Sequence, residues 1–452
     1  MRSTIVASSE LRLAASSPLS PYDHLNGGRT VPILLTYQTI IEEQKFKDAL
    51  REVLAVFPYA RLGGRYEGGS SISFQQSGGV PLEVVEVDGE FSTLSYLFSS
   101  SAGPQIMKVV DHDQFTPSVK GSMDPDKFDP SQPLLAIRLT YYKDATVICL
   151  CAQHAAVDFG GMIKFLKALS DVYGGGELPE STTPQPTAST SSTSLPSLVS
   201  PKPHALLVTS TPGNAPQQPP PFARVAPRIM GDSVVVYPLA KTTLMAMKSI
   251  VSAAAPVGIS TDDVVTALVW RALLKLRLHQ LDDLDTEGLS TTLSRAWSFE
   301  RGATAVEGAV CNSGNTVTQC CSVLLISELL AAPIATVATH LRNTLIARPT
   351  HFCEETAFLN VEREKGNVCK QTFDENALTF IVSSWRAWRW EDCCFEGTAP
   401  AQFDHGCNVG VVSVMVSDGG GGVNVYHSSS RENCEYFANA MDEEIVELTM
   451  EE

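Results

Sequence analysis

The sequence predicts an α/β or α+β chain of two related halves, and three observations support this fold class. Strand-like apolar runs alternate with amphipathic helical stretches in the first part of the chain and again in the last. Between them, residues 179–221 are rich in Ser, Thr, Pro and Gln, a composition that buries too little apolar surface to offset its ordering entropy. The chain has 452 residues, of which 44% are hydrophobic, enough for two or three domains with a large core.

The regular structure of the first half should begin with an amphipathic helix. Residues 43–59 place apolar side chains on one helical face, and a proline near the end stops the helix. Residues 134–142 and 145–152 indicate the two strands of a hairpin, joined by a short polar turn. An apolar helix follows His154 and ends at the triple glycine of residues 174–176.

The second half repeats this alternation. A strand at residues 232–239 precedes a helix that begins at Thr242 or Thr243, and Ser260 is the expected N-cap of a second helix. This second helix is apolar nearly all the way round, so we expect it to be central. Further strands are expected within residues 320–327, 378–385, 409–416 and 423–428, before a closing helix. We place an N-terminal domain at residues 1–177, a crossover linker at 178–229 and a C-terminal domain at 230–452.

Composition excludes several classes of protein. The net charge of −17 argues against broad nucleic-acid binding, which needs clustered Lys and Arg. No run of about 18 apolar residues predicts a membrane span. The Ser-rich N-terminus could mimic a transit peptide, but Glu10 and the lack of a sustained apolar face argue against one, and no secretory signal follows the first basic residue. We therefore expect a cytoplasmic protein.

The eleven cysteines fit reduced thiols in that compartment. Many of them lie in apolar runs, and no CxxC pair is present. Cys393 and Cys394 are adjacent in sequence, which places them poorly for chelating one ion together. His351 and Glu355 have a metal-ligand spacing but lack a third ligand, so a surface helix is the better reading. We predict no metal site.

One segment carries the strongest functional signal. Residues 149–169 read as a buried strand, a polar break with His154 and Asp158, and then an apolar helix. The bare spacing is weak evidence, because His279 and Asp283 repeat it where a helix enters a charged stretch. A histidine where a core strand ends can be held rigidly and still face a cleft. His154 is therefore a candidate general base, and a structural histidine at a strand end is the alternative reading.

Several segments, in their order, resemble the BAHD acyltransferases, CoA-dependent enzymes that share an HxxxDG motif. The resemblance covers nearly the whole chain except the low-complexity crossover. Two departures stand out: Phe159 separates Asp158 from the motif's glycine, and DCCFEG at 392–397 replaces the family's DFGWG. The matching segments are LSPYDHLNGGRTVPILLTYQ, FKDALREVLAVFPYARLGGRY, QHAAVDFGG, ISTDDVVTALVWRALLKLR, LSRAW with the later NSGN, and SSWRAW.

The resemblance implies two similar domains, each a mixed β-sheet flanked by helices, in a chloramphenicol-acetyltransferase-like α/β fold with a solvent channel between the halves. It implies transfer of an acyl group from acyl-CoA to a hydroxyl or amine of a small molecule, by a monomer without a permanently bound cofactor. Two alternatives stay open. One is a condensation-type enzyme that takes its acyl group from a carrier protein, and the other is an inactive binding member of the fold.

The resemblance also assigns roles to individual residues. His154 would act as general base without a covalent intermediate, while Asp158 would point away and orient the loop by pairing with Arg295, or alternatively with Arg301. Ser384 and Trp385 would be oxyanion donors, or else a strand serine and a core tryptophan. Gly160 and Gly161 would allow close packing where the helix begins. His405 stays an unplaced loop histidine, and Cys393 and Cys394 have no base near them to make either a nucleophile.

Overall fold

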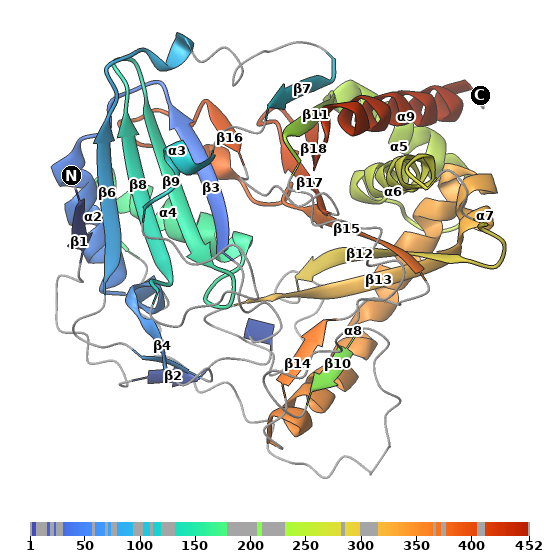
Figure 1. Ribbon diagram of the computed structural model, residues 1–452, viewed down its shortest axis with the longest axis horizontal. Helices are drawn as coiled ribbons and strands as arrows, with labels where there is room; N and C mark the ends of the chain where they lie inside the picture. The colour runs from blue at the N-terminus through green and yellow to red at the C-terminus, as the bar shows by residue number, and fades with distance from the viewer. Residues whose placement is uncertain are drawn as a thin grey trace.

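Two mixed β-sheets, one from each half of the chain, form the frame of the molecule (Figure 1). This arrangement of sheets flanked by helices is the predicted fold class. The structure, a computed structural model, describes residues 2–5, 16–18, 22–23, 30–56, 59–67, 71–73, 79–93, 103–108, 112–118, 132–178, 206–209, 231–281, 285–298, 315–364, 368–371, 377–404 and 412–450.

The first sheet has six strands in the order β1-β6-β8-β9-β3-β16. β6 and β8 are parallel, and the other neighbours are antiparallel. The predicted hairpin is confirmed as β8 and β9. The strands are β1 (Arg2–Ile5), β6 (Val80–Glu86), β8 (Leu135–Tyr141), β9 (Thr146–Gln153), β3 (Thr30–Tyr37) and β16 (Gln402–Asp404).

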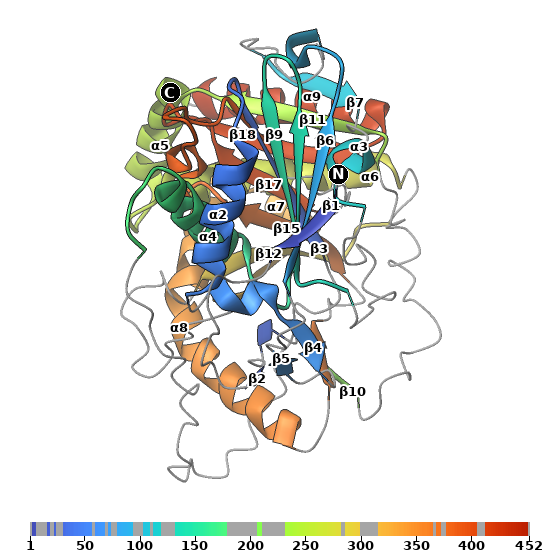
Figure 2. The ribbon, with the colours of Figure 1, turned by 90° about the vertical axis from the view of Figure 1, so that its left-hand side faces the viewer.

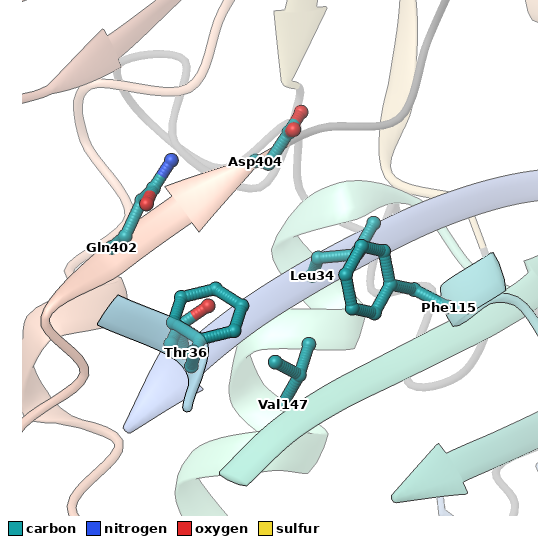
Figure 3. A pocket seen from close by; sticks show the side chains of 7 residues that line it. Leu34, Thr36, Phe115, Val147, Gln402 and Asp404 are labelled. Carbon is teal, nitrogen blue, oxygen red and sulfur yellow. The ribbon is translucent and has the colours of Figure 1, made fainter. Parts of the chain in front are cut away.

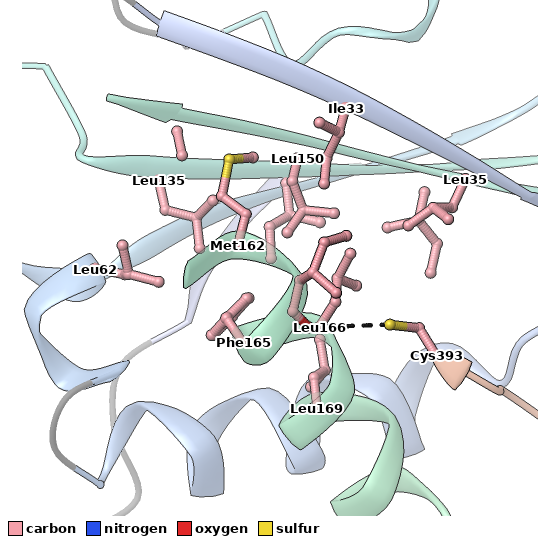
Figure 4. Packing of buried hydrophobic residues seen from close by; sticks show 14 of the residues in the cluster. Ile33, Leu35, Leu62, Leu135, Leu150, Met162, Phe165, Leu166, Leu169 and Cys393 are labelled. Atoms are coloured by element: carbon pink, nitrogen blue, oxygen red, sulfur yellow. Dashed lines mark hydrogen bonds between the residues drawn. The ribbon is translucent and has the colours of Figure 1, made fainter. Parts of the chain in front are cut away.

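Helices α2 (Glu43–Leu54) and α4 (Phe159–Tyr173) cover one face of this sheet (Figure 2). Both lie within the helical ranges that the sequence predicted. Apolar side chains of the strands and helices interdigitate there, and Figure 4 shows Ile33, Leu150 and Leu166 among them. On the opposite face, buried side chains of β3 and β9 contact the short segments η2 (Phe91–Thr93) and α3 (His112–Phe115). β9 is therefore buried along its whole length.

The second sheet has seven strands in the order β13-β12-β15-β17-β18-β11-β7. β12, β15 and β17 run parallel, and the other pairs are antiparallel. The strands are β13 (Val317–Leu325), β12 (Ser290–Ser298), β15 (Ala377–Ser384), β17 (Val412–Ser417), β18 (Val423–Ser429), β11 (Ser233–Leu239) and β7 (Gln105–Lys108).

Helix α6 (Thr261–His279) is the centre of the second core, as its all-round apolar pattern predicted. It contacts β15 and the helices α5 (Lys241–Ala254), α8 (Ile334–Glu364) and α9 (Arg431–Met450). Ser260 caps its first turn in a capping box with Asp263, so the predicted N-cap is confirmed. The short α7 (Ile326–Ala331) follows β13.

Two strands cross between the sheets, so the predicted domain boundaries do not divide the chain cleanly. β7, from the first half, pairs with β11 of the second sheet, and β16, from the second half, pairs with β3 of the first. The expected linker also contributes a strand, β10 (Leu206–Thr209), which pairs with β14 (Val368–Gln371). A small third sheet holds β2 (Ser16–Pro18), β5 (Ser71–Ser73) and β4 (Arg65–Glu67), near the 3₁₀ turn η1 (Tyr59–Gly63).

Candidate active site

His154 follows the last residue of β9, the strand between β8 and β3. Every residue of β9 is buried, whereas His154 itself is only partly buried. Its neighbours Ala155 and Ala156 pack into the core of the first domain. The local sequence thus anchors the backbone on both sides of the histidine, and only its side chain reaches partly exposed space.

Asn315 of the second half contacts the His154 ring. The His154 Nδ1 and Asn315 Oδ1 atoms are 2.8 Å apart, and Asn315 Nδ2 donates to the His154 carbonyl oxygen over 2.5 Å. Asn315 lies just before β13 and is fully buried. The contact therefore brings together two residues that are 161 positions apart in the chain.

A buried ion pair lies behind Asn315. Asp23 Oδ1 accepts from the Asn315 backbone N–H over 2.8 Å and from Nδ2 over 3.0 Å. Asp23 Oδ2 is 2.8 Å from the Arg61 guanidinium, which also donates to the Ala155 carbonyl over 3.3 Å. The exposed fractions are 0% for Asp23 and 2% for Arg61. Because the pair is buried away from water, its two charges have to be compensated by each other and by fixed protein groups.

Sequence reasoning missed Asn315, Asp23 and Arg61 as functional residues. Each lies in a segment that carried the family resemblance: Asp23 in LSPYD, Arg61 in FPYARLGG and Asn315 in NSGN. For Asp23 and Arg61 the available signal was a charged residue beside apolar ones, whereas Asn315 is uncharged and lies in a polar segment. Nothing in one sequence, however, could connect Asp23 with a residue 292 positions away.

Both carboxylate oxygens of Asp158 accept hydrogen bonds, one from the start of α4 and one from Thr316 of the second half. Its Oδ1 accepts from the Gly161 N–H over 2.8 Å, which caps the N-terminus of α4. Its Oδ2 accepts from the Thr316 backbone N–H over 2.8 Å and from the Thr316 hydroxyl over 2.9 Å. Because Asp158 is 3% exposed, these bonds replace its hydration.

The expected Asp158–Arg295 ion pair is not what the structure shows. Arg295 lies 2.7 Å from Asp262 and 3.2 Å from Asp263, the acidic residues in the first turn of α6. Arg342 also pairs with Asp263. β12 aims Arg295 at this helix end, where two carboxylates outcompete one that Thr316 already satisfies. Arg295 holds the pKa of the Asp262 carboxyl below its usual range, against the effect of burial. The alternative partner, Arg301, lies outside the described residues.

Ser384 and Trp385, the expected oxyanion donors, give their hydrogens to protein acceptors. The Ser384 hydroxyl donates to Asp262 over 2.5 Å, and the Trp385 indole N–H donates to the Ser383 hydroxyl over 2.9 Å. A serine hydroxyl has one hydrogen, as does the indole nitrogen. We therefore do not assign oxyanion stabilisation to either residue.

Phe159, the residue inserted after Asp158, packs between the two domains. Its ring stacks on Trp385 and meets Phe403 edge-on, with centroids 5.6 Å apart. The next residue has to be glycine, because a Cβ atom on Gly160 would lie 2.2 Å from the Trp388 ring. A Cβ on Gly161 would lie 2.4 Å from Val157. The expected close packing at the start of α4 is therefore present, with Trp388 of the second half against Gly160 and Val157 of the first half against Gly161.

The divergent segment DCCFEG forms an ordered strap on the first domain. Phe395 is fully buried among the rings of Tyr37, Phe46 and Tyr173, at centroid distances of 5.4, 5.7 and 5.1 Å. The Cys393 thiol points to the carbonyl of Ile163 in α4, at 4.0 Å (Figure 4). Burial raises the pKa of that thiol to about 12, which argues against a thiolate nucleophile.

A tight turn ends the strap and carries an unusual backbone. Glu396 has a φ of 49° and Gly397 a φ of 69°, between the bridged residues Phe395 and Thr398. Glu396 is the non-glycine residue with positive φ in the described chain, and the Tyr173 hydroxyl bonds its carboxylate. The segment DCCFEG therefore packs on the first domain, although its sequence departs from DFGWG.

A small pocket lies farther along the same sheet, between β3, β9 and β16 (Figure 3). Leu34, Val147 and Phe115 line its apolar side, and Gln402 and Asp404 its polar rim. Its volume of about 10 Å³ is near the minimum for one water molecule. It also lies near the start of β9, whereas His154 follows the end of that strand, so it is not the site around His154.

The remaining candidates lie apart from this site. His279 is exposed at the end of α6 and stacks on Tyr436. Glu355 pairs with Arg348 at 2.7 Å, while the side chain of His351 and all of His405 lie outside the described residues. In the described part of the chain, no three His, Cys, Asp or Glu side chains are placed to hold a metal ion together. The described helices include none that is long and apolar enough to cross a membrane.

Comparison with known proteins adds a family and a fold. The model of the Transferase family matches residues 1–444. No curated protein matches the sequence.

Among solved structures, vinorine synthase has a TM-score of 0.64 at 16% identity, covering 96% of this chain and 95% of that one. TRI101 of F. sporotrichioides, complexed with coenzyme A and T-2, has a TM-score of 0.69 at 16% identity, covering 94% and 97%. The condensation domain of the monacolin K polyketide synthase MokA has a TM-score of 0.57 at 12% identity, covering 97% and 98%.

Proposed function

The chain belongs to the Transferase family, the BAHD acyltransferases, and from that premise we propose that it transfers an acyl group from acyl-CoA to a hydroxyl or amine of a small molecule, with His154 as general base. The observation that carries the proposal is the position of His154. A rigid strand end holds its backbone, and Asn315 of the other domain holds its Nδ1 atom at 2.8 Å. A general base needs this fixed geometry to reach one proton.

The chemistry proceeds without a covalent enzyme intermediate. The Nε2 atom of His154 takes the proton of the acceptor while the acceptor oxygen or nitrogen bonds to the thioester carbonyl carbon. The carbonyl electron pair moves to its oxygen and returns as the carbon–sulfur bond breaks. The imidazolium then gives its proton to the departing thiolate, so that acylated acceptor and free CoA leave and neutral histidine remains. General-base assistance of this kind contributes about 10²–10⁴-fold.

The donor is assigned to acyl-CoA because the family uses it, and a related structure, TRI101, was solved with coenzyme A. Acyl-CoA enters as a cosubstrate and not as a resident cofactor. Both reactants have to meet at His154, which follows a strand of the first sheet and contacts Asn315, just before β13 of the second. The meeting point of the two domains is therefore the proposed reaction centre.

Asp158 supports the reaction indirectly, by orienting the loop that carries His154. With one carboxylate oxygen on the α4 N-terminus and the other on Thr316, it fixes the loop of residues 154–158 between the domains. Its carboxylate points at backbone and hydroxyl donors, so we assign it an orienting role and no proton transfer.

The test is release of free thiol from a panel of acyl-CoAs with mixed small alcohols and amines. We expect wild type to release thiol in the presence of an acceptor, and His154→Ala to lose about 10²–10⁴-fold in kcat. His279→Ala is the matched control, since His279 has the same spacing to an aspartate but is exposed at the end of α6. It should keep wild-type activity.

Two outcomes would contradict the proposal. Thiol release that survives in His154→Ala would remove the general base. No release from any acyl-CoA, but transfer from an acyl group on a carrier protein, would favour the condensation-type alternative. If neither donor is used, the inactive binding member is the remaining reading.

A further inference from the structure

We propose that Asp23, held by Arg61, is a positioning residue that sets the tautomer of His154 through the side-chain amide of Asn315. The inference rests on the proposed function for its catalytic meaning, since the tautomer decides which ring nitrogen is the base. The contacts that carry it form one chain that is buried as far as Asn315: Arg61 to Asp23, Asp23 to Asn315, and Asn315 to the partly buried His154.

The first step is the orientation of the Asn315 amide. An amide has one end that donates and one that accepts, and an ionised carboxylate only accepts. One end of the Asn315 amide lies 3.0 Å from Asp23 Oδ1 and 2.5 Å from the His154 carbonyl oxygen. Both of those atoms are acceptors, so the NH₂ group must lie there. In the flipped orientation, the amide oxygen would face two acceptor oxygens, Asp23 Oδ1 and the His154 carbonyl oxygen.

The second step is the proton on the histidine ring. With its NH₂ group committed, Asn315 presents its carbonyl oxygen to His154 Nδ1 at 2.8 Å. A carbonyl oxygen cannot donate, so Nδ1 must carry the hydrogen. In a neutral imidazole the other nitrogen, Nε2, then has the lone pair. Nε2 is the atom that a general base at this position uses.

The third step is the charge on Asp23. Asp23 has to be ionised to fix the Asn315 amide, because a protonated carboxyl could donate to Asn315 and release its orientation. Arg61 is always charged and lies 2.8 Å from Asp23 Oδ2, and the backbone N–H of Asn315 adds a second donor to Oδ1 at 2.8 Å. All three side chains are at most 2% exposed, so water does not compete for these bonds.

The same chain of contacts could instead serve only to hold the two domains together. A structural role and a tautomer-setting role differ in one measurable property, the proton position on the His154 ring. Long-range ¹H–¹⁵N correlation of histidine-labelled protein distinguishes the two tautomers without any substrate. The His154 signals are identified by their loss in His154→Ala.

In wild type we expect the Nδ1–H form of His154. Asp23→Asn keeps the shape of the side chain but removes one of the two obligate acceptors of the Asn315 amide and leaves the His154 carbonyl oxygen, so signals of the Nε2–H form should appear beside those of the Nδ1–H form. We expect kcat to fall about 10–100-fold with little change in KM, by analogy with the losses seen when the hydrogen-bond partner of a metal-ligating histidine is removed. The swap of Asp23→Asn with Asn315→Asp gives the ring an obligate acceptor again and should restore Nδ1–H.

The matched control is Glu444→Gln. Glu444 is also a fully buried carboxylate paired with an arginine, Arg271, at 2.9 Å. This pair joins α6 to α9 and shares no residue with the network of Arg61, Asp23, Asn315 and His154. It should lose stability without changing the His154 tautomer. If Asp23→Asn does not fold, Arg61→Met, which removes the charge that keeps Asp23 ionised, is measured in the same way.

An Nε2–H signal in wild type, or an unchanged Nδ1–H signal in a folded Asp23→Asn or Arg61→Met protein, would overturn the inference. Failure of the proposed function looks different. It would appear as absent thiol release while the tautomer still responds to Asp23.

Discussion

The ring of Phe159 stacks on the ring of Trp385, with centroids 3.9 Å apart and planes 9° apart. Phe159 begins α4 of the first domain, and Trp385 follows β15 of the second. Both side chains are less than 10% exposed and belong to a core that includes residues of both halves. The phenylalanine that interrupts the HxxxDG pattern is therefore part of the contact between the domains.

Removing the Phe159 ring should lower the stability of the folded protein. We expect Phe159→Ala to lower the free energy of unfolding by about 3–5 kcal/mol, because it opens a cavity and removes a stacked pair. Phe159→Leu should lose less, since it keeps most of the apolar volume. Urea unfolding followed by tryptophan fluorescence measures both. A loss below about 1 kcal/mol for the alanine variant would mean that the ring is not an interdomain contact.

Gly160 should tolerate no side chain while Trp388 is present. Gly160→Ala places a methyl group 2.2 Å from the Trp388 ring, so we expect a loss of about 1–3 kcal/mol from overpacking. Gly258→Ala is the control, because nothing lies within 4 Å of a Cβ there. Thermal unfolding measures the two variants. Adding Trp388→Ala to Gly160→Ala should recover part of the loss, and no recovery would place the strain elsewhere.

The revised partners of Asp158 and Arg295 can be tested by double-mutant cycles. Asp158→Asn with Thr316→Val should show coupling of about 0.5–3 kcal/mol, as should Arg295→Met with Asp262→Asn, because each pair is in direct contact. Asp158→Asn with Arg295→Met should be additive. Chemical denaturation of the single and double variants gives the three values, and strong coupling in the last cycle would restore the original ion-pair assignment.

The buried ring of His427 should make the fold sensitive to acid. Burial lowers its pKa to about 4, whereas a histidine in the unfolded chain titrates near 6.5. Between these values the unfolded state binds the additional proton, so the free energy of unfolding is highest above pH 6.5 and falls by up to about 3 kcal/mol as the pH drops to 4. Ser413 lies 3.2 Å from the ring Nδ1 atom.

Unfolding curves of wild type and His427→Gln across this pH range test the prediction. The variant should lose about 3 kcal/mol less between pH 6.5 and 4 than wild type does. Parallel pH profiles for the two proteins would assign the acid sensitivity to other groups.

Much of the fold could be predicted from local pattern. Helical spacing located α2 and α4, the hairpin signal located β8 and β9, and Ser260 marked the start of α6. These features follow from interactions between residues close in the chain, which a single sequence contains. The exchanged strands β7 and β16 could not be predicted in the same way, because which sheet edge a short strand joins depends on packing far from it in sequence.

The candidate site likewise has features that depend on local sequence and features that depend on contacts between distant segments. The sequence by itself determined that His154 ends a core strand and that Asp158 opens the next helix, since strand burial and helix capping are local. Only the tertiary structure decided their partners: Asn315 for His154, Asp23 for Asn315, Thr316 for Asp158, and Asp262 for Arg295. Charged and polar groups pair with the partners that the fold brings within about 3 Å. A single sequence lists these groups but does not show which of them come that close.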